Sequence, residues 1–194
     1  MSSRELRIWG RSNSINVQKV LWCCGELDVP YERVDVGGPF GGNREPEYLR
    51  LNPNGLVPTI SDGDFVLWES NAIVRYLAAR HGMGTLCPED LARRADADRW
   101  MDWQMSTLWA NLRPVFIGLV RTPPQNRDRA SIAAAIGKTA ENLAVLDAHL
   151  AGRDYVVGTA FTMADIPVGA TAYRWFSLDI ERPPMRSLEA WSIS

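Results

Sequence analysis

The amino-acid sequence predicts an α/β domain followed by an all-α helical domain, from two patterns and a break between them. Short apolar segments of strand length alternate with helical segments early in the chain, whereas later apolar patterns all have helical period. Gly82-Met83-Gly84 and Cys87-Pro88 separate the two regions, since glycine and proline interrupt regular structure. We therefore predict domains over residues 1–82 and 90–194, joined by a linker over residues 83–89.

The N-terminal region opens with the pattern of a β-α-β unit. Leu6–Trp9 has strand character, and Tyr31–Val36 alternates like a second strand. Between them we predict a helix that ends at Asp28-Val29-Pro30. Its apolar side chains recur with helical period at Val17, Val20, Leu21, Cys24 and Leu27.

A hairpin and a second helix are predicted further along. The strands Val57–Ile60 and Phe65–Trp68 flank Asp62-Gly63, which is a hairpin turn signal. Ser70 is expected to cap the helix that follows, because serine is a preferred N-cap residue. Ile73, Tyr76 and Leu77 share one face of that helix.

Val57-Pro58 predicts an unusual edge at the start of this hairpin. Proline cannot donate a hydrogen bond to a strand ladder. We therefore expect the backbone N–H and C=O of Val57 to remain available to an extended ligand.

The C-terminal half predicts three main helices. A long helix spans Glu89 to about Arg121 with a bend near Pro114, and a second spans about Asp128 to Leu150. Thr162-Met163-Ala164-Asp165 has the spacing of a capping box, with Asp in place of the usual Glu. It precedes an apolar helix over residues 166–176, so we interpret it as a folding signal.

Composition excludes several classes of function. The chain has 194 residues, a net charge of −2 and no basic run, which disfavours nucleic acid as a partner. Its start lacks the apolar stretch of a signal peptide, and no window has the roughly 20 apolar residues of a membrane span. We therefore expect a cytoplasmic protein that does not bind membranes.

The three cysteines and two histidines predict no metal site. They form neither a CxxC pair nor a Cys/His ligand spacing. Cys24 falls on the apolar face of the first predicted helix, so we interpret it as a small buried apolar side chain.

The motif NPxGxVP, formed by Asn52 to Pro58, and the pair Glu69-Ser70 resemble the cytosolic glutathione transferase family. The resemblance extends over nearly the whole chain and implies a thioredoxin-like fold for the N-terminal domain. It also implies glutathione as co-substrate, a small electrophile as second substrate, a role in detoxification, a homodimer and a cis Val57-Pro58 bond. In that family the valine backbone pairs with the cysteinyl part of glutathione, and the Glu-Ser pair holds its γ-glutamyl end.

Ser14 is the predicted catalytic residue, with Asn16 and Ser12 as alternatives. All three lie in the loop that leads from the first strand into the first helix, where open α/β sheets bind ligands. The position of Ser14 resembles that of the thiol-activating serine in theta and delta class transferases. The alternative is that one of these residues only caps the helix.

A hydroxyl and a helix N-terminus together suffice to ionise a thiol. Lowering a pKa of about 8.5 by two units requires about 2.7 kcal/mol. A hydrogen bond to a charged sulfur supplies about 1.5–3 kcal/mol and a helix N-terminus about 0.3–1 kcal/mol. Neither a metal nor a base is therefore needed.

The remaining glutathione contacts are assigned group by group. Glu69 is expected to face the γ-glutamyl ammonium, and Ser70 with its helix N-terminus the adjacent carboxylate. Helix capping is the alternative role of both residues. Asp98 resembles the aspartate that reaches the γ-glutamyl amine across the family dimer, although a solvated helix charge is the alternative.

The glycyl end is where the sequence departs from the family. Leu56 stands before Val57-Pro58, where family members often carry lysine, glutamine or histidine. Arg44, next to Asn43, is then the nearest basic candidate for the glycyl carboxylate.

The electrophile is expected to bind along the first long helix. Aromatic walls with one cation suit flat or halogenated electrophiles. The candidates are Trp103, Trp109, Arg113 and Phe116, although helical spacing alone would also place such residues in a core.

Two functions of different class remain open. One is an enzyme that ionises glutathione at Ser14 and adds it to an electrophile. The other is a non-catalytic, transferase-like binding or scaffold protein, which Leu56 favours. Family members continue past the tryptophan that Trp191 resembles, so the second domain is short by comparison. This short domain also favours the binding or scaffold role.

Overall fold

The computed structural model describes residues 6–193 of the chain. These residues form two compact units, divided between Glu89 and Asp90. The first contains a sheet with helices and the second is entirely helical, so the predicted α/β and all-α classes are confirmed. Across the part of the chain that the structure describes, no helix combines the length and apolarity that crossing a bilayer requires.

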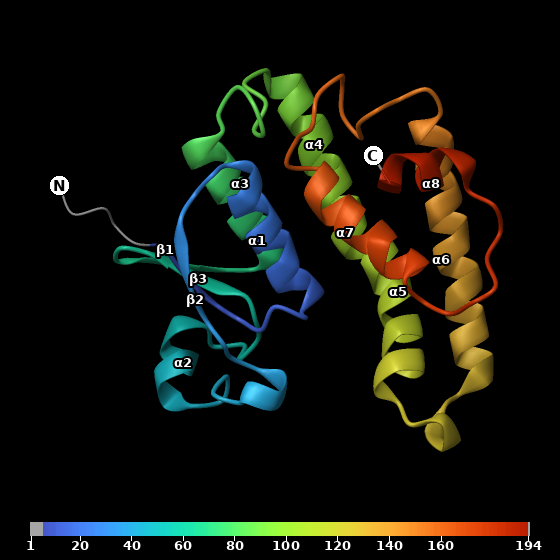
Figure 1. The fold of residues 1–194 in the computed structure, drawn as a ribbon, viewed down its shortest axis with the longest axis horizontal. Helices are drawn as coiled ribbons and strands as arrows, with labels where there is room; N and C mark the ends of the chain where they lie inside the picture. Colours follow the sequence, from blue (N-terminus) through green and yellow to red (C-terminus); the bar gives the residue numbers. More distant parts are fainter. Residues whose placement is uncertain (1–5, 194) are drawn as a thin grey trace. The chain divides into compact units, whose positions relative to one another are not determined.

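The first unit is built on a four-stranded sheet with the order β2-β1-β3-β4. Strand β1 pairs in parallel with β2 and antiparallel with β3, and β3 pairs antiparallel with β4. Helices α1 and α3 pack together, and α2 lies apart from them (Figure 1). In chain order the elements are β1 (Leu6–Trp9), α1 (Ile15–Glu26), β2 (Tyr31–Val34), a short 3-10 helix (Gly38–Phe40), α2 (Pro46–Leu51), β3 (Thr59–Asp62), β4 (Phe65–Trp68) and α3 (Ser70–His81).

Alternation and helical period explain the core of this unit. In β1, Leu6 and Ile8 are buried and Arg7 is exposed, as expected of a strand with one apolar face. The buried face of α1 includes Val17, Val20 and Cys24. Burial raises the pKa of the Cys24 thiol to about 12, which agrees with its interpretation as an apolar side chain.

The first strand of the hairpin differs from its prediction, whereas β4 spans the predicted residues Phe65–Trp68. The turn occupies Gly63 and Asp64, one residue later than the predicted Asp62-Gly63, because Asp62 still belongs to β3 and pairs with Phe65. However, β3 begins at Thr59, because the residues before it form a loop around the Val57-Pro58 bond. The prediction that Ser70 caps α3 is wrong: Glu69 holds the cap position and Ser70 is the first helical residue.

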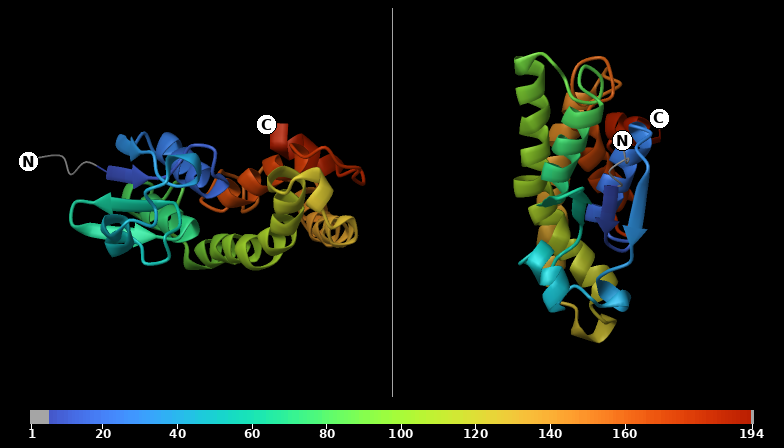
Figure 2. Two further views of the ribbon diagram at one scale, coloured as in Figure 1. Left: turned by 90° about the horizontal axis from the view of Figure 1, so that it is seen from below. Right: turned by 90° about the vertical axis from the view of Figure 1, so that its left-hand side faces the viewer.

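The second unit begins with one long, irregular helical stretch that is visible in both orientations of Figure 2. It consists of α4 (Leu91–Trp103), a π-helical segment (Gln104–Leu108), α5 (Trp109–Phe116) and a second π-helical segment (Ile117–Arg121). Helical structure thus continues through Pro114, and the irregular turns lie on both sides of α5. A short 3-10 helix (Pro124–Asn126), α6 (Arg129–Leu150), α7 (Asp165–Phe176) and α8 (Arg186–Ile193) complete the unit.

Packing of α5 and α8 against α6 forms the core of the second unit. Leu112, Leu143 and Leu146 are fully buried there, as is Trp175 of α7. The predicted contact between Thr162 and Asp165 is present before α7, but Ala164 holds the cap position and Asp165 is the first helical residue. The Asp165 carboxylate accepts hydrogen bonds from the Thr162 N–H at 2.8 Å and the Thr162 hydroxyl at 3.1 Å.

Candidate active site

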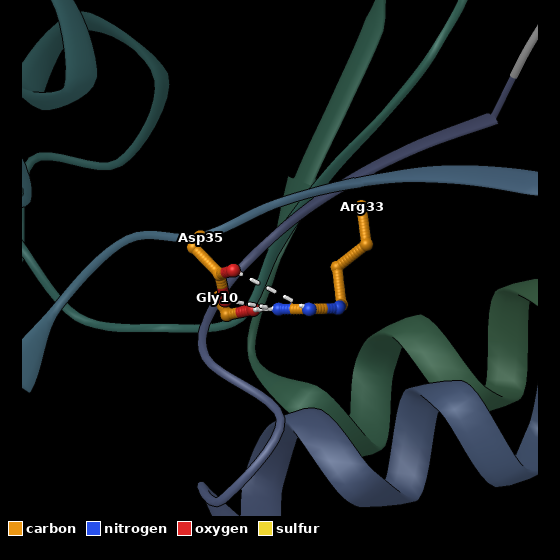
Figure 3. A network of polar contacts seen from close by, with 3 residues as sticks. All are labelled: Gly10, Arg33 and Asp35. Carbon is orange, nitrogen blue, oxygen red and sulfur yellow. Dashed lines mark hydrogen bonds and ion pairs between the residues drawn. The ribbon is translucent and has the colours of Figure 1, made fainter. Parts of the chain in front are cut away.

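The loop between β1 and α1 is anchored to β2 and the residues that follow it. The Gly10 N–H donates to the Val34 carbonyl at 2.9 Å, and the Arg11 N–H donates to the Val36 carbonyl at 3.2 Å. The Arg33 guanidinium donates to the Gly10 carbonyl at 3.1 Å and pairs with Asp35 (Figure 3). Both polar groups of the Gly10 backbone are therefore fixed where the loop begins.

Gly10 also sets how closely three segments approach one another. Its φ is +153°, and a Cβ there would lie 2.5 Å from Val17 Cγ2 and 3.3 Å from Val57 Cβ. A side chain at this position would therefore push α1 and the Val57 loop away from the end of β1.

We expect Gly10→Ala to lower the free energy of unfolding by about 2–3 kcal/mol, the cost of overpacking a tight site. Gly25→Ala is the matched control, because no atom lies within 4 Å of a Cβ added there and its backbone is helical. That variant should be neutral or gain about 0.5–1 kcal/mol from helix propensity. Urea unfolding of both variants checks this, and equal midpoints would contradict it.

Ser14 occupies the N-cap position of α1. Its backbone is extended, with φ −87° and ψ 123°, and its carbonyl accepts the Gln18 N–H at 2.9 Å. Its side chain makes no capping hydrogen bond, so the alternative of a purely capping role is not what the geometry favours. The half-buried hydroxyl is therefore available beside the unpaired N–H groups of the first helical turn.

A contact between Asn16 and Ser70 joins the N-termini of α1 and α3. The Ser70 hydroxyl donates to Asn16 Oδ1 at 3.3 Å, and Ser70 is buried. Two residues that were assigned to different parts of glutathione are thus in direct contact. Ser12, the third catalytic candidate, is exposed in the turn before α1.

The Val57 backbone fulfils the expectation of a free edge. The Val57-Pro58 bond is cis, which confirms the prediction. Within residues 6–193, neither the N–H nor the C=O of Val57 forms a hydrogen bond. Pro58 is buried and Val57 is half-buried beside Gly10, so this polar pair lies close to the β1–α1 loop.

Tyr48 and Asn52 hold this loop in place, although no motif in the sequence predicts a role for Tyr48. The Tyr48 hydroxyl donates to the Leu56 carbonyl at 2.5 Å, and Asn52 Nδ2 donates to the same oxygen at 2.9 Å. Asn52 Nδ2 also donates to Thr59 Oγ1 at 3.1 Å. The asparagine of the motif is therefore a structural residue that fixes the peptide before Val57.

The candidates for the glycyl end are exposed. Leu56 is 59% exposed and offers no polar side-chain atom. The Arg44 guanidinium donates to the Asn54 carbonyl at 3.4 Å, and it lies so close to Gly55 that a Cβ there would be 2.7 Å from it. Arg44 thus borders the loop that carries Val57.

Glu69 is exposed in a backbone conformation that places the start of α3. Its φ is +74°, an uncommon value for a residue other than glycine. Such conformations persist only where the surrounding structure holds them, and they cluster at active sites and ligand-binding positions. The carboxylate of Glu69 and the buried Ser70 hydroxyl therefore stand together at the N-terminus of α3.

Lys19 is a buried ionisable residue on α1 whose burial the helical period of the sequence did not predict. It lies on α1 with 1% of its surface exposed, and its ammonium donates to Asn71 Oδ1 at 3.3 Å. Burial lowers the pKa of Lys19 to about 7, while the negative charge of Glu69 acts in the opposite direction. The only sequence signal was a lysine on an otherwise apolar helix face.

The remaining predicted site residues belong to the second unit. Asp98 is half-buried on α4, and Trp103 near the end of that helix packs edge-on against Trp100 at 5.1 Å. Trp109, Arg113 and Phe116 follow one another at helical spacing along α5. The roles proposed for these residues toward glutathione and the electrophile stay predictions.

The first unit therefore combines a hydroxyl at a helix N-terminus, a free backbone pair and an acidic residue beside a second helix N-terminus. These groups match the thiol, the peptide backbone and the amino acid end of a small thiol peptide. Within residues 6–193, no group of three or more His, Cys, Asp or Glu side chains is arranged to hold a metal ion.

Comparison with known proteins identifies the family. Residues 13–80 match the glutathione S-transferase N-terminal domain, and residues 108–192 match the glutathione S-transferase C-terminal domain. Glutathione S-transferase GstB of Escherichia coli K12 is 44% identical over 188 residues, which cover 96% of this chain and 90% of that protein. Glutathione S-transferase 3 of Zea mays is 35% identical over 165 residues, which cover 82% of this chain and 73% of that protein.

A solved structure agrees with these matches. The theta class glutathione S-transferase of Xanthomonas axonopodis pv. citri, crystallised with glutathione bound, superposes with a TM-score of 0.94 at 53% identity. The match covers 98% of this chain and 91% of that one. The chain therefore belongs to the glutathione S-transferase family, with a thioredoxin-like N-terminal domain and a helical C-terminal domain.

Proposed function

We propose that this protein is an enzyme that binds glutathione in its first unit, ionises the thiol and transfers the sulfur to a small electrophile. The observation that carries the proposal is the Ser14 hydroxyl, which lies at the N-terminus of α1 and is not used for capping. Membership of the transferase family and similarity to a relative solved with glutathione support the identity of the ligand.

Glutathione binding follows from the groups around Ser14. The free N–H and C=O of Val57 pair with the cysteinyl backbone as one short strand does with another. Glu69 faces the γ-glutamyl ammonium, and Ser70 with the first N–H groups of α3 binds the neighbouring carboxylate. Arg44 is the cation assigned to the glycyl carboxylate, and Asp98 is assigned to the γ-glutamyl amine from a partner subunit.

The reaction consists of thiol ionisation followed by nucleophilic attack. The Ser14 hydroxyl donates to the thiolate sulfur, and the N-terminus of α1 stabilises the same negative charge. The thiol proton passes to solvent, and the sulfur then attacks an electrophile held along Trp103, Trp109, Arg113 and Phe116. We propose that the protein works as a cytoplasmic homodimer with domains over residues 1–82 and 90–194.

We expect Ser14→Ala to raise the thiol pKa of bound glutathione by about one to two units, because it removes one hydrogen bond to a charged sulfur. The measurement is the ultraviolet absorbance of the thiolate, followed against pH in the complex. The wild-type protein should show a thiol pKa well below the free value of about 8.5.

Ser12→Ala and Asn16→Ala are the comparison variants. Ser12 is exposed and should leave the thiol pKa unchanged, whereas Asn16→Ala should weaken binding through loss of its contact with Ser70. An unshifted thiol in the wild-type complex would refute catalysis and support the binding or scaffold role. A shift lost only in Asn16→Ala would move the catalytic role to that residue.

A further inference from the structure

Two arginines share one aromatic ring in the second unit. The Arg174 guanidinium of α7 lies 4.8 Å from the centre of the Phe116 ring. The Arg121 guanidinium, at the end of the second π-helical segment, lies 5.6 Å from the same centre. Packing of residues far apart in the sequence therefore places two permanent positive charges around one half-buried phenylalanine.

Neither charge is balanced by a carboxylate. Within residues 6–193, the guanidinium group of neither Arg121 nor Arg174 forms an ion pair or a hydrogen bond. The Nε of Arg174 is buried and has no hydrogen-bond partner. Arg113, one turn before Phe116 on α5, adds a third positive charge to this face.

This arrangement is unfavourable without an anion. Two guanidinium groups near one ring repel each other, and burial, with a smaller contribution from Arg121, lowers the pKa of Arg174. Each guanidinium carries N–H donors in a planar fork that matches a carboxylate. The phenylalanine ring beside them offers an apolar surface to the molecule that bears that carboxylate.

We propose that Arg121 and Arg174 form an anion-binding pair beside Phe116 that selects electrophiles carrying a carboxylate. The inference rests on the proposed transferase function, because Phe116 is one of the residues assigned to the electrophile. The substrates that such a pair would select are aryl halides that bear a carboxylate.

The reaction on such a substrate balances without a further reagent. The glutathione sulfur forms a bond to the ring carbon that carries the halogen. The carbon–halogen bond breaks, halide leaves with the electron pair, and the thiol proton has already passed to solvent. The carboxylate is unchanged, so the arginine pair acts on binding and orientation.

A matched pair of electrophiles tests the proposal. A chlorodinitrobenzoate and the corresponding chlorodinitrobenzamide differ in charge but share the reacting carbon. For each compound, kcat/KM is divided by the rate constant of its uncatalysed reaction with glutathione. The ratio of the acid to the amide then reports the preference for an anion.

We expect this ratio to fall about tenfold in Arg174→Gln and in Arg121→Gln, the loss typical of a charge-assisted hydrogen bond at a partly exposed site. Arg174→Lys should restore part of it, because the charge returns without the fork. Arg153→Gln is the control, since it removes one exposed positive charge of the same unit and should leave the ratio unchanged. Circular dichroism checks that every variant is folded.

Calorimetry with dinitrobenzoate, which has no leaving group, separates this inference from the proposed function. Turnover of both electrophiles with an unchanged ratio in both glutamine variants would overturn the anion pair and leave the transferase function standing. If neither electrophile is turned over but the wild type binds dinitrobenzoate and Arg174→Gln does not, the result would support the anion-binding pair and count against catalysis. Equal dinitrobenzoate binding by the wild type and both glutamine variants would overturn the pair.

Discussion

Replacement of Asp165 by alanine is expected to lower the free energy of unfolding by about 3–5 kcal/mol, the cost of breaking a buried polar network. The fully buried carboxylate accepts the Val156 N–H at 2.8 Å and both the N–H and the hydroxyl of Thr162. Burial raises the pKa of Asp165, and these hydrogen bonds oppose that rise. Alanine would leave three donors without an acceptor in the core of the second unit.

Asp128 is the matched control for this variant. Asp128 lies at the N-cap of α6, and its carboxylate accepts the Ser131 N–H at 3.0 Å from a fully exposed position. Asp128→Ala should therefore destabilise the protein far less than Asp165→Ala, because water can solvate the released N–H. Urea denaturation measures both, and similar losses for the two variants would show that burial of Asp165 is not the cause.

The second large effect is a dependence of stability on pH that Lys19 produces. The folded protein holds the Lys19 proton with a pKa of about 7, whereas an unperturbed lysine has 10.5. Between these values unfolding takes up a proton, so the free energy of unfolding rises with pH across that window. The maximum slope is about 1.4 kcal/mol per pH unit, or roughly 5 kcal/mol over the whole window.

Lys19→Met should remove this contribution. From pH 7 to 9, the wild-type protein should gain roughly 2–3 kcal/mol of stability relative to Lys19→Met. The comparison is made between variants because the buried Cys23 and Cys24, whose pKa values are raised, act in the opposite direction in both proteins. Lys138→Met replaces the only other lysine, which is exposed on α6, and should keep the wild-type slope. Parallel pH profiles for wild type and Lys19→Met would contradict the prediction.

Local sequence patterns were sufficient to predict which strands and helices are present. Alternation in Leu6–Trp9 and helical period after Ser14 depend on neighbouring residues only, and both elements are present where they were predicted. Boundaries were less accurate where distant segments intervene. The start of β3 follows from its pairing with β1, and the cap of α3 follows from the backbone of Glu69.

The candidate site was predictable only as a set of residues. NPxGxVP and Glu69-Ser70 identified the ligand through a family resemblance that the comparisons confirm. The contact of Ser70 with Asn16 and the support of the Leu56 carbonyl by Tyr48 could not be read from spacing. These contacts join different segments of the chain, and the number of residues between two segments does not predict whether they meet in the folded protein.

By itself, the sequence determined the order of strands and helices, the α/β and all-α classes and the transferase family. Hydrophobic period and turn-forming residues depend on a few neighbouring positions, so they can be recognised from the sequence. Only the tertiary structure decided that Lys19 is buried, that Val57 lies beside Gly10 and that Arg121 and Arg174 share Phe116. Burial and the pairing of charges depend on which faces pack together, and that packing is settled when the whole unit folds.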